Sequence, residues 1–549
     1  MKDFCNIKTR DDFADYFDIP RNKLTYVLYK KGVENYYKSF EIPKKRGGSR
    51  HISAPHGYLK FIQKKLASTL YDCENYKTVR VCNISHGFEK DKSIITNALV
   101  HRNKKYVLNI DLKDFFDSFH FGRVRGFFNK DKKFSFPIEI ATIIAQLTCF
   151  NGVLPQGAST SPVITNLMCK IFDFRILKIA KKYKVDYTRY ADDLTFSTND
   201  KHFIEHYKDF LSIIQEEVER AGFFVNDEKI RLQFKDSQQI VTGIVVNKKI
   251  NISKSYYKVT RAMARSLYSQ GEFTIDGVRG TLAQLEGRFS FIDSISLFNN
   301  RKDKQKHNFF SLSSREREYS RFIFYKYFCV HNRPVIITEG KTDIRYLKAA
   351  LKKMYAAYPN LISRDKNGKF EFKISFFNRS KKVQYFLGVP RDGGDGLKNI
   401  YQLFFDNQYN YYKYFSDLRK NTPLPIILLY DNETVSRKPL KVFTQHAHMK
   451  DTDIELLKKD LYFLLHKEAN LYLATNNLVS GKNECEIEEL FPQAVLDHKI
   501  DGKTFSLKGE DSSRHYSKEI FSKYIYSHYS EIDFNNFCPL LEALSNIVN

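Results

Sequence analysis

The pattern of apolar and polar positions divides the chain near residue 300. Residues 1–40 predict short helices, and residues 41–300 alternate strand-like and helical stretches without a break. A polar, basic stretch over 299–318 then interrupts the alternation, as segments between domains do. The pattern therefore predicts a first domain that mixes α and β elements, and a separate domain after the interruption.

The second part of the chain contains two short, almost wholly apolar runs, RPVIIT (333–338) and PLPIILLY (423–430). Each contains or begins with proline and is followed directly by an acidic residue, as expected of buried parallel strands. Acidic residues at the carboxyl ends of such strands lie where open α/β sheets bind ligands. We therefore expect an α/β domain with a mainly parallel sheet. The predicted divisions are a first domain over 1–300, a linker over 301–332, the α/β domain over 333–500, and a segment without an assigned role over 501–549.

The sharpest local pattern is VDYTRYADDLTFST (185–198), in which two β-rich segments flank a Tyr-Ala-Asp-Asp box. The flanking segments predict a hairpin with Asp192 and Asp193 at its tip. Upstream, YVLNIDLKDFFDSF (106–119) predicts an apolar strand that ends at Asp111 and continues into an amphipathic helix. These two patterns supply three carboxylates for one site.

Three neighbouring carboxylates repel one another by several kcal/mol per pair at ~4 Å, so the arrangement favours bound cations. Two Mg²⁺ ions about 4 Å apart would activate an attacking 3′-hydroxyl and hold a triphosphate for in-line displacement. A solvated acidic turn is the alternative interpretation of the same residues. Asp111, Asp192 and Asp193 are therefore the candidate catalytic and metal-binding residues.

The charge of the chain favours a nucleic-acid partner. Its 549 residues allow two or three domains, and Lys and Arg number 89 against 63 Asp and Glu, a formal net charge of +26. An excess of this size favours a polyanionic partner, although a basic, solvated surface gives the same count. The 35 Tyr and 47 Phe are suited to stacking on bases, while most of these rings must pack in the core.

The cysteines and the chain terminus indicate a compartment. The eight cysteines are scattered without Cys-x-x-Cys pairs, which argues against a zinc site and a disulfide framework and fits a reducing cytosol. The first residues, MKDFCNIKTRDDF, have no apolar signal core, and no uncharged apolar run reaches the ~18 residues of a membrane span. We expect a soluble, cytoplasmic protein that does not enter a membrane.

The motifs over residues 40–300 resemble, in order, those of reverse transcriptases, which have a right-hand fold of fingers, palm and thumb. IPKKRGGSRHISAP (42–55) is similar to the fingers segment that grips the incoming deoxynucleoside triphosphate, and the resemblance assigns this contact to Lys44, Lys45 and Arg50. The basic, aromatic helices after residue 253 suit a thumb that tracks phosphates, although a solvated basic face has the same pattern.

The same resemblance assigns four more substrate-binding residues. Phe116, five residues after Asp111, corresponds to the ring that excludes a ribose 2′-hydroxyl, although the neighbouring phenylalanines also fit a helix core. LPQGASTSP (154–162) is similar to the loop in which Gln156 and Gly157 lie against nucleotide and template. Lys229 is similar to the lysine that protonates the leaving pyrophosphate, and a solvated lysine is its alternative.

Two further boxes resemble those of retron reverse transcriptases: NALVH (97–101) and VTGIVVN (241–247). The resemblance implies an enzyme that binds its own structured non-coding RNA, begins synthesis from a guanosine 2′-hydroxyl within it, and makes a branched RNA–DNA hybrid. The RNA-binding residues that it implies are Asn97 and His101 in the first box, with Ala98 between them, and Thr242 and Gly243, after Val241, in the second.

The α/β domain resembles the Toprim domain of topoisomerases, primases and OLD-type nucleases. The motifs are VIITEGKTDIRYLKAAL (335–351), LLYDNET (428–434) and CEIEELFP (485–492). The resemblance implies a nuclease that binds one or two Mg²⁺, with Glu339 as its catalytic acid. The family's Asp-x-Asp is replaced here by Asp431-Asn432-Glu433, and the third motif is also typical of an ordinary acidic helix start. The implied metal ligands are Glu339, Asp343, Asp431, Glu433 and Glu488, with Glu489 as the neighbouring candidate.

Three hypotheses follow. The first is a polymerase joined to a nuclease that acts in antiphage defence, the role ascribed to the retron subgroup with this domain order. The second keeps the polymerase and makes the Toprim-like domain a binding platform without catalysis, which only the change at Glu433 favours. The third is a general intron-type or diversity-generating reverse transcriptase, against which the two retron-like boxes argue. No pattern in the sequence sets an oligomeric state.

Overall fold

The computed structural model describes residues 4–44, 47–73, 84–302, 309–390, 393–405, 409–416, 424–434, 438–506 and 514–549. They form two compact units, Met1–Lys254 and Ser255–Asn549, which are described separately below. Within the described residues, no helix has the length and apolar character needed to cross a bilayer.

The units divide at residue 254, whereas the sequence pattern predicts a boundary near 300. The two helices assigned to a thumb, α11 (Lys254–Gln270) and α12 (Leu282–Lys302), lie almost wholly within the second unit. Helix α12 packs on α13 (Ser314–Phe328), where the rings of Phe289 and Tyr319 stack with centroids 5.3 Å apart. The predicted linker thus contains a packed helix, because apolar residues alternate with the charges that interrupt the pattern.

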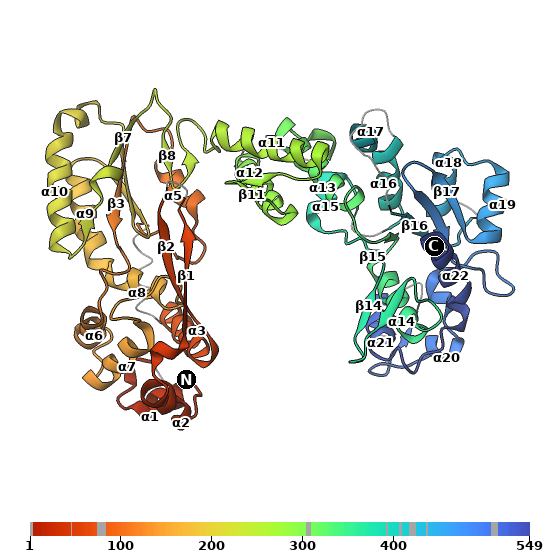
Figure 1. The fold of residues 1–549 in the computed structure, drawn as a ribbon, viewed down its shortest axis with the longest axis horizontal. Helices are drawn as coiled ribbons and strands as arrows, with labels where there is room; N and C mark the ends of the chain where they lie inside the picture. The colour runs from red at the N-terminus through yellow and green to blue at the C-terminus, as the bar shows by residue number, and fades with distance from the viewer. Residues whose placement is uncertain are drawn as a thin grey trace. The chain divides into compact units, whose positions relative to one another are not determined.

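A five-stranded antiparallel sheet organises the first unit. Its order is β4-β5-β3-β6, with β7 also paired with β3. Alternation along β3 turns Leu108 and Ile110 into the core and places Asn109 and Asp111 on the other face. Helices α9 and α10 lie side by side along this sheet (Figure 1). The strands are β3 (Tyr106–Lys113), β4 (Asp186–Tyr190), β5 (Asp193–Thr198), β6 (Phe224–Val225) and β7 (Arg231–Phe234).

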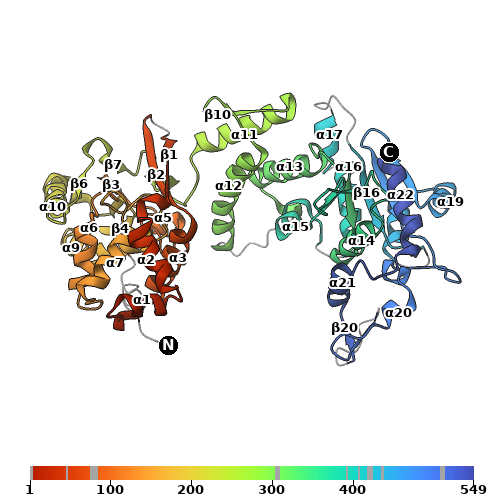
Figure 2. The same ribbon diagram turned by 60° about the horizontal axis from the view of Figure 1, so that its bottom comes forward.

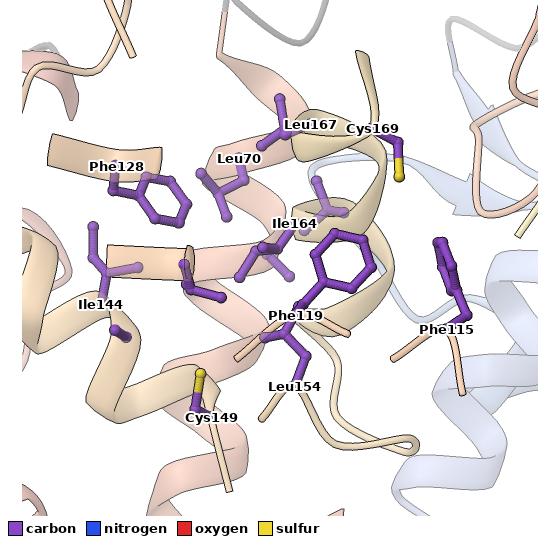
Figure 3. Close-up of a cluster of buried hydrophobic side chains, with 14 of the residues drawn as sticks. Leu70, Phe115, Phe119, Phe128, Ile144, Cys149, Leu154, Ile164, Leu167 and Cys169 are labelled. Atoms are coloured by element: carbon purple, nitrogen blue, oxygen red, sulfur yellow. The ribbon is translucent and has the colours of Figure 1, made fainter. Parts of the chain in front are cut away.

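Helices cover the rest of this unit and enclose its core. Figure 3 shows Phe119 among Leu154 and Ile164 in this core, with Phe115 beside them. The helices are α1 (Arg10–Tyr16), α2 (Arg21–Thr25), α3 (Gly57–Asp72), α5 (Ile94–Val100), α6 (Phe121–Lys130), α7 (Ile138–Thr148), α8 (Ser161–Met168), α9 (Lys170–Lys182) and α10 (Tyr207–Arg220).

The segment after Asp111 is not the amphipathic helix that its spacing of phenylalanines predicts. Strand β3 continues to Lys113, and residues 114–118 form turns that begin at Asp114, whose φ is +45°. Helix α6 starts only at Phe121, where the His120 side chain accepts a hydrogen bond from the Arg123 N–H. The left-handed backbone at Asp114 prevents a helix from continuing out of the strand.

Two hairpins extend from the sheet and helices of this unit. Strands β1 (Tyr37–Pro43) and β2 (Ser49–Pro55) pair in antiparallel register. Strands β8 (Ile240–Val241) and β9 (Ile244–Val245) are joined by Thr242 and Gly243, both with positive φ, which is the turn that tight hairpins prefer.

The second unit is built on a five-stranded sheet with the order β15-β12-β16-β18-β17. All neighbours are parallel except β17, which runs antiparallel to β18 at one edge. The two apolar runs form β12 and β16, whose residues are all buried, as expected of central strands. The strands are β12 (Val335–Thr338), β15 (Ser375–Phe376), β16 (Ile426–Tyr430), β17 (Tyr462–His466) and β18 (Leu471–Thr475).

Helices α21 and α22, from the described last part of the chain, pack into the core beside this sheet. Helices α14 and α21 lie side by side (Figures 1 and 2), and Arg345 Nη1 donates to Ser522 Oγ at 2.8 Å. The other elements of the unit are β10 (Thr274–Ile275), β11 (Val278–Arg279), α14 (Lys341–Lys353), β13 (Ile362–Arg364), β14 (Phe370–Phe372), α15 (Lys381–Leu387), α16 (Asp395–Phe405), α17 (Tyr411–Ser416), α18 (Pro439–His446), α19 (Asp451–Asp460), α20 (Gln493–Leu496), β19 (Thr504–Phe505), β20 (His515–Tyr516), α21 (Lys518–Ser527) and α22 (Cys538–Val548).

Candidate functional site

The sheet of the first unit brings the three predicted aspartates together. The predicted hairpin is present: β4 and β5 pair up to Tyr190 and Asp193, and Ala191, with φ +56°, and Asp192 form its turn. Asp111 on β3 lies directly opposite Asp193 on β5. The Leu112 N–H donates to the Asp192 carbonyl at 3.0 Å, which holds the turn against β3.

These carboxylates are costly to ionise together. Burial, together with the charges of Asp192 and Asp111, raises the pKa of Asp193 to about 7. Burial likewise raises the pKa of Asp192, with Lys229 and Arg50 opposing the effect. The Lys229 ammonium lies 2.8 Å from Asp111 Oδ2, so a cation already faces the cluster. A divalent cation would relieve the remaining repulsion.

A cavity of about 310 Å³ opens beside the aspartates. Asp111 and Asp193 line one part of it, and Thr242 and Gly243 of the β8–β9 turn line another. The structure therefore places the second retron-like box next to the acids, facing open space. The remaining lining residues are Asn109, Ile110, Lys229, Arg231, Gln233 and Ile240.

The first retron-like box lies in the interior instead. Asn97 and His101 are fully buried, and burial lowers the pKa of His101 to about 3. His101 Nε2 lies 2.7 Å from Thr188 Oγ1, and that hydroxyl donates to Asn97 Oδ1 at 2.5 Å; His101 Nδ1 lies 2.7 Å from Ser197 Oγ. The RNA contact that the resemblance implies for Asn97 and His101 stays a prediction, and in this structure neither side chain is exposed. These side chains fix α5 to β4 and β5.

Of the predicted fingers residues, Arg50 lies on β2 and Lys44 directly follows β1. Arg50, exposed on β2, acts electrostatically on Asp192, while Lys45 lies outside the described residues. The Ser53 N–H donates to the Gln156 carbonyl at 2.9 Å. Gly157 has φ +124°, and a Cβ there would lie 2.9 Å from the Ser53 carbonyl oxygen, so a side chain would separate the loop from β2.

Phe116 lies on the turn that follows β3, and its ring is half-buried. The ring packs beside Phe115, with centroids 5.5 Å apart, and its centroid is 6.3 Å from that of Phe88. Phe115 and Phe119, in contrast, are buried in the core. Of the three phenylalanines, Phe116 is the one whose position allows contact with a substrate.

A buried ion pair beneath the catalytic turn was not predicted. Arg189, fully buried on β4, donates from Nε and Nη2 to the two carboxylate oxygens of Asp173 at 2.8 Å each, and from Nη1 to the Ala191 carbonyl at 3.3 Å. Asn166 Nδ2 donates to the Gly87 carbonyl at 2.9 Å. A Cβ on Gly87 would lie 2.6 Å from the Ala191 nitrogen. No sequence pattern marks such a pair, because Asp173 on α9 meets Arg189 on β4 only when the helix packs on the strand.

Arg189→Met is expected to lower the free energy of unfolding of the first unit by about 3–5 kcal/mol, because Asp173 would be left buried without its partner. Chemical denaturation measures the loss. The double variant Arg189→Met/Asp173→Leu should recover a large part of it, since no charge then remains. If Arg189→Met unfolds like the wild type, the pair does not stabilise the turn.

A second acidic site lies at the carboxyl ends of β12 and β16 in the second unit. Glu339 follows β12 directly, and its Oε1 accepts a hydrogen bond from the Asp431 N–H at 3.0 Å. Asp343, near the start of α14, accepts from the Gly340 N–H at 2.8 Å. Asp431 Oδ1 accepts from the Ile487 N–H at 3.0 Å, which brings the segment with Glu488 to the site.

The carboxylates of this site also oppose one another. Burial, together with the charges of Asp343 and Glu433, raises the pKa of Glu339 to about 7. Burial raises the pKa of Asp431 well above its ordinary value, with Asp343 and Glu339 adding to the effect. The pKa of Glu488 is raised to about 7, chiefly by burial. The site therefore has the donor set that divalent cations prefer, and ionising it without one is costly.

Lysines occupy part of this site. Lys438 Nζ lies 2.7 Å from Glu433 Oε1, and Lys518 Nζ lies 3.1 Å from Glu488 Oε2. Both carboxylate oxygens of Glu488 are buried and have no hydrogen-bond partner within the described residues. The contact of Glu488 with Lys518 is therefore an ion pair without a hydrogen bond. Glu489 instead pairs with Lys482 and accepts from the Glu486 N–H, so of the two candidates only Glu488 faces the site.

Two residues of the second site were not predicted. Lys518 belongs to α21, in the segment that received no role. Arg379 donates to the carbonyls of Thr338 and Glu339, and to the Gly393 carbonyl at 3.0 Å. Neither lies in a recognisable motif, because each reaches the site from a separate element.

In neither acidic site do the described carboxylates lie as close together as the ligands of one cation would. Across the residues with described positions, no three acidic, histidine or cysteine side chains are close enough to hold a metal ion as they stand. Lysines contribute to this spacing through ion pairs. Lys229 pairs with Asp111 in the first site. In the second site Lys438 pairs with Glu433 and Lys518 with Glu488. The donor sets fit divalent cations once these lysines move aside.

The comparisons with known proteins concern mainly the first site. Residues 42–255 match the family model described as reverse transcriptase (RNA-dependent DNA polymerase). The retron Ec86 reverse transcriptase of Escherichia coli is 34% identical over 261 residues, which are 47% of this chain and 74% of that protein. The retron Mx65 reverse transcriptase of Myxococcus xanthus is 32% identical over 309 residues, 53% of this chain and 69% of that protein.

Among solved structures, apo telomerase from Candida Tropicalis is similar with a TM-score of 0.30 and 16% identity, over 47% of this chain and 52% of that one. A score this low does not support an argument about the fold. The sequence relatives do decide the family, because of their identity and coverage, and the family model matches the segment that holds Asp111, Asp192 and Asp193. This chain belongs to the retron reverse transcriptases, which are RNA-directed DNA polymerases.

Proposed function

We propose that this polymerase copies part of its own structured non-coding RNA into a branched RNA–DNA hybrid, using deoxynucleoside triphosphates. The observation that supports the proposal is the cavity that Asp111 and Asp193 share with Thr242 and Gly243. A primer end in that cavity would lie against the acids on one side and the β8–β9 turn on the other. Family membership argues against a general intron-type enzyme.

The aspartates fit two Mg²⁺ ions, which when bound supply an activated 3′-hydroxyl and charge stabilisation on the triphosphate. Arg50 can bind phosphate oxygens in a bidentate manner. Lys229, released from Asp111, would donate its proton to the leaving pyrophosphate. Gln156 and Gly157 would lie against the nucleotide and the template.

Sequencing the nucleic acid that co-purifies with the full chain tests this proposal. We expect DNA joined to RNA through a 2′–5′ branch at a guanosine. Linear DNA without a branch, or RNA from unrelated transcripts alone, would contradict it.

Phe116→Ala is expected to let the enzyme incorporate ribonucleotides, because the half-buried ring would no longer exclude the ribose 2′-hydroxyl. Primer extension with each nucleotide type measures the discrimination, and we expect it to fall by at least about tenfold, the effect of roughly 1.4 kcal/mol. Phe127→Ala, which removes a partly buried ring from α6 packed on Phe128 and Phe134, is the matched control. Unchanged discrimination in Phe116→Ala would make this ring part of the core.

For the second unit we propose a Toprim-type, metal-dependent nuclease that acts in antiphage defence. The cluster of Glu339, Asp343, Asp431 and Glu488 supports it, since burial raises the pKa of all four acids, a pattern typical of functional sites. One or two Mg²⁺ held there would supply an activated water for phosphodiester hydrolysis.

A binding platform without catalysis is the second candidate, and one contact favours it. Glu433, which stands where the Toprim pattern has aspartate, is turned to Lys438. The two candidates differ in the effect of Glu433→Asp. In a nuclease this change restores the shorter ligand and should raise Mg²⁺-dependent cleavage of DNA or RNA by the purified protein. In a platform neither protein cleaves.

A further inference from the structure

The second unit has a cavity of about 540 Å³ that none of the motifs explains. Asn432, two residues after β16, and Asn477, two residues after β18, both line it. Because β16 and β18 are parallel neighbours, their carboxyl ends meet at one edge of the sheet. Open α/β sheets bind ligands at this edge. The cavity is thus in a favourable place for a ligand, and its volume is within the roughly 300–1,000 Å³ of small-molecule sites.

The lining combines positive charge with amide groups and apolar surface. Lys458 and Lys459, from the last turn of α19, face the cavity, and neither forms an ion pair within the part of the chain that the structure describes. Leu461, Leu478 and Pro539 contribute apolar surface. Ammonium groups suit phosphate, and flat apolar surface suits a base or sugar.

One polar atom at the cavity lacks a partner. Asn477 Oδ1 is buried and, among the described residues, accepts no hydrogen bond. An unsatisfied acceptor of this kind costs free energy unless a ligand supplies a donor. Asn432, in contrast, is held in place, since its Nδ2 donates to the Asn476 carbonyl at 2.8 Å. The cavity therefore offers a rigid wall, and Asn477 Oδ1, which is covered in this structure, becomes an acceptor for a ligand once its side chain turns.

The cavity also adjoins the second acidic site. Asn432 lies between Asp431 and Glu433 in the chain, and its backbone N–H donates to Asn476 Oδ1 at 3.0 Å, so it faces β18 while Asp431 faces Glu339. A ligand in the cavity would contact Asn432, which adjoins Asp431 and Glu433 in the chain. This position suits one unit of a nucleic-acid strand.

We propose that this cavity binds a nucleotide. Lys458 and Lys459 hold its phosphate, Leu461 and Leu478 contact the base, and the Asn477 side chain turns so that its Oδ1 accepts from an N–H of the base. The nucleotide is either free or the end of a strand, and the second case rests on the proposed nuclease function. The chemistry is the same in both, so the experiment separates the sources.

The test is calorimetric titration of the full chain with deoxyadenosine 5′-monophosphate in EDTA, which removes any contribution from metal. Lys458→Glu/Lys459→Glu should weaken binding by at least about tenfold. The control Lys467→Glu/Lys499→Glu makes the same charge change at exposed lysines outside the cavity and should bind like the wild type. DNA synthesis and thermal unfolding should be unchanged in both, which excludes misfolding.

A second titration uses a 12-residue DNA strand. If the strand competes with the mononucleotide and its binding needs Lys458 and Lys459, the ligand is a strand end; if only the mononucleotide binds, it is a free nucleotide. Absence of nucleotide binding, or equal binding by the wild type and the cavity variant, overturns the inference. Nucleotide binding without any cleavage would instead contradict the proposed nuclease and leave the inference standing.

Discussion

Asp193→Asn is expected to lower DNA synthesis by at least about a thousandfold while leaving the fold intact. The change removes a carboxylate directly opposite Asp111 and keeps its size and position in β5. A loss of this size corresponds to about 4 kcal/mol in the activation barrier, which is reasonable for losing a ligand to catalytic cations. Primer extension with Mg²⁺ on an RNA template measures it.

The control is Asp186→Asn on the same hairpin. Asp186 is exposed, pairs with Lys104, and lies at the far end of β4 from the turn. Exposed pairs contribute little to stability, so this variant should extend primers normally. If Asp193→Asn extends primers as fully as the wild type does, Asp193 is not a catalytic residue.

The same variant should change how stability depends on pH in metal-free buffer. Burial, and then Asp192 and Asp111, raise the pKa of Asp193 from an ordinary 3.8 to about 7 in the folded protein. Between these values the unfolded chain binds fewer protons than the folded one, so stability falls as pH rises from about 4 to 7. Asn does not ionise, and chemical denaturation of Asp193→Asn should show a smaller fall.

Glu339→Gln is expected to abolish metal-dependent cleavage and protection against phage, and to leave hybrid DNA at its normal level. Glutamine can still accept the hydrogen bond from the Asp431 N–H but has no charge for a cation. The three aspartates of the polymerase site lie in the other compact unit, so DNA synthesis should not respond. Both outputs are measured in the same cells, by DNA recovery and by phage plaque counts.

Glu371→Gln is the matched control, since Glu371 is exposed on β14 of the same unit and pairs with Arg333. It should protect cells as the wild type does. Protection that survives Glu339→Gln would favour the binding platform. Loss of DNA in this variant would show that the two activities are not separable.

The sequence predicted those features that depend on short-range pattern. The Tyr-Ala-Asp-Asp hairpin, the strand with Asp111 and the buried runs β12 and β16 each follow from local alternation and from the residues that bound them. The acids then meet because neighbouring strands end at one edge of a sheet. The sequence pattern did not give the order in which the strands pair. The resemblance to known families implied the general fold.

Features that depend on distant contacts were not predictable. In the sequence, Asn97 and His101 look like exposed polar residues. In the structure they are buried, because His101 hydrogen-bonds to the hydroxyls of Thr188 on β4 and Ser197 on β5, and the Thr188 hydroxyl donates to Asn97. The compact units divide at residue 254 and not near the predicted boundary at 300 for a similar reason. Charged residues mark a surface but do not show which helices pack together. The positive φ at Asp114 ended a helix that the phenylalanine spacing favours.

The packing of residues 501–549 restricts how this polymerase can exchange its partner domain. Phe521 and Ile525 of α21 and Leu541 of α22 are fully buried in one core with Ile336 of β12 and Leu347 of α14. A gene shortened at codon 501 would expose that apolar surface, so its product should aggregate and its phenotype would report misfolding. Recombination that preserves both halves must instead cross near codon 254 and transfer everything that follows as one module.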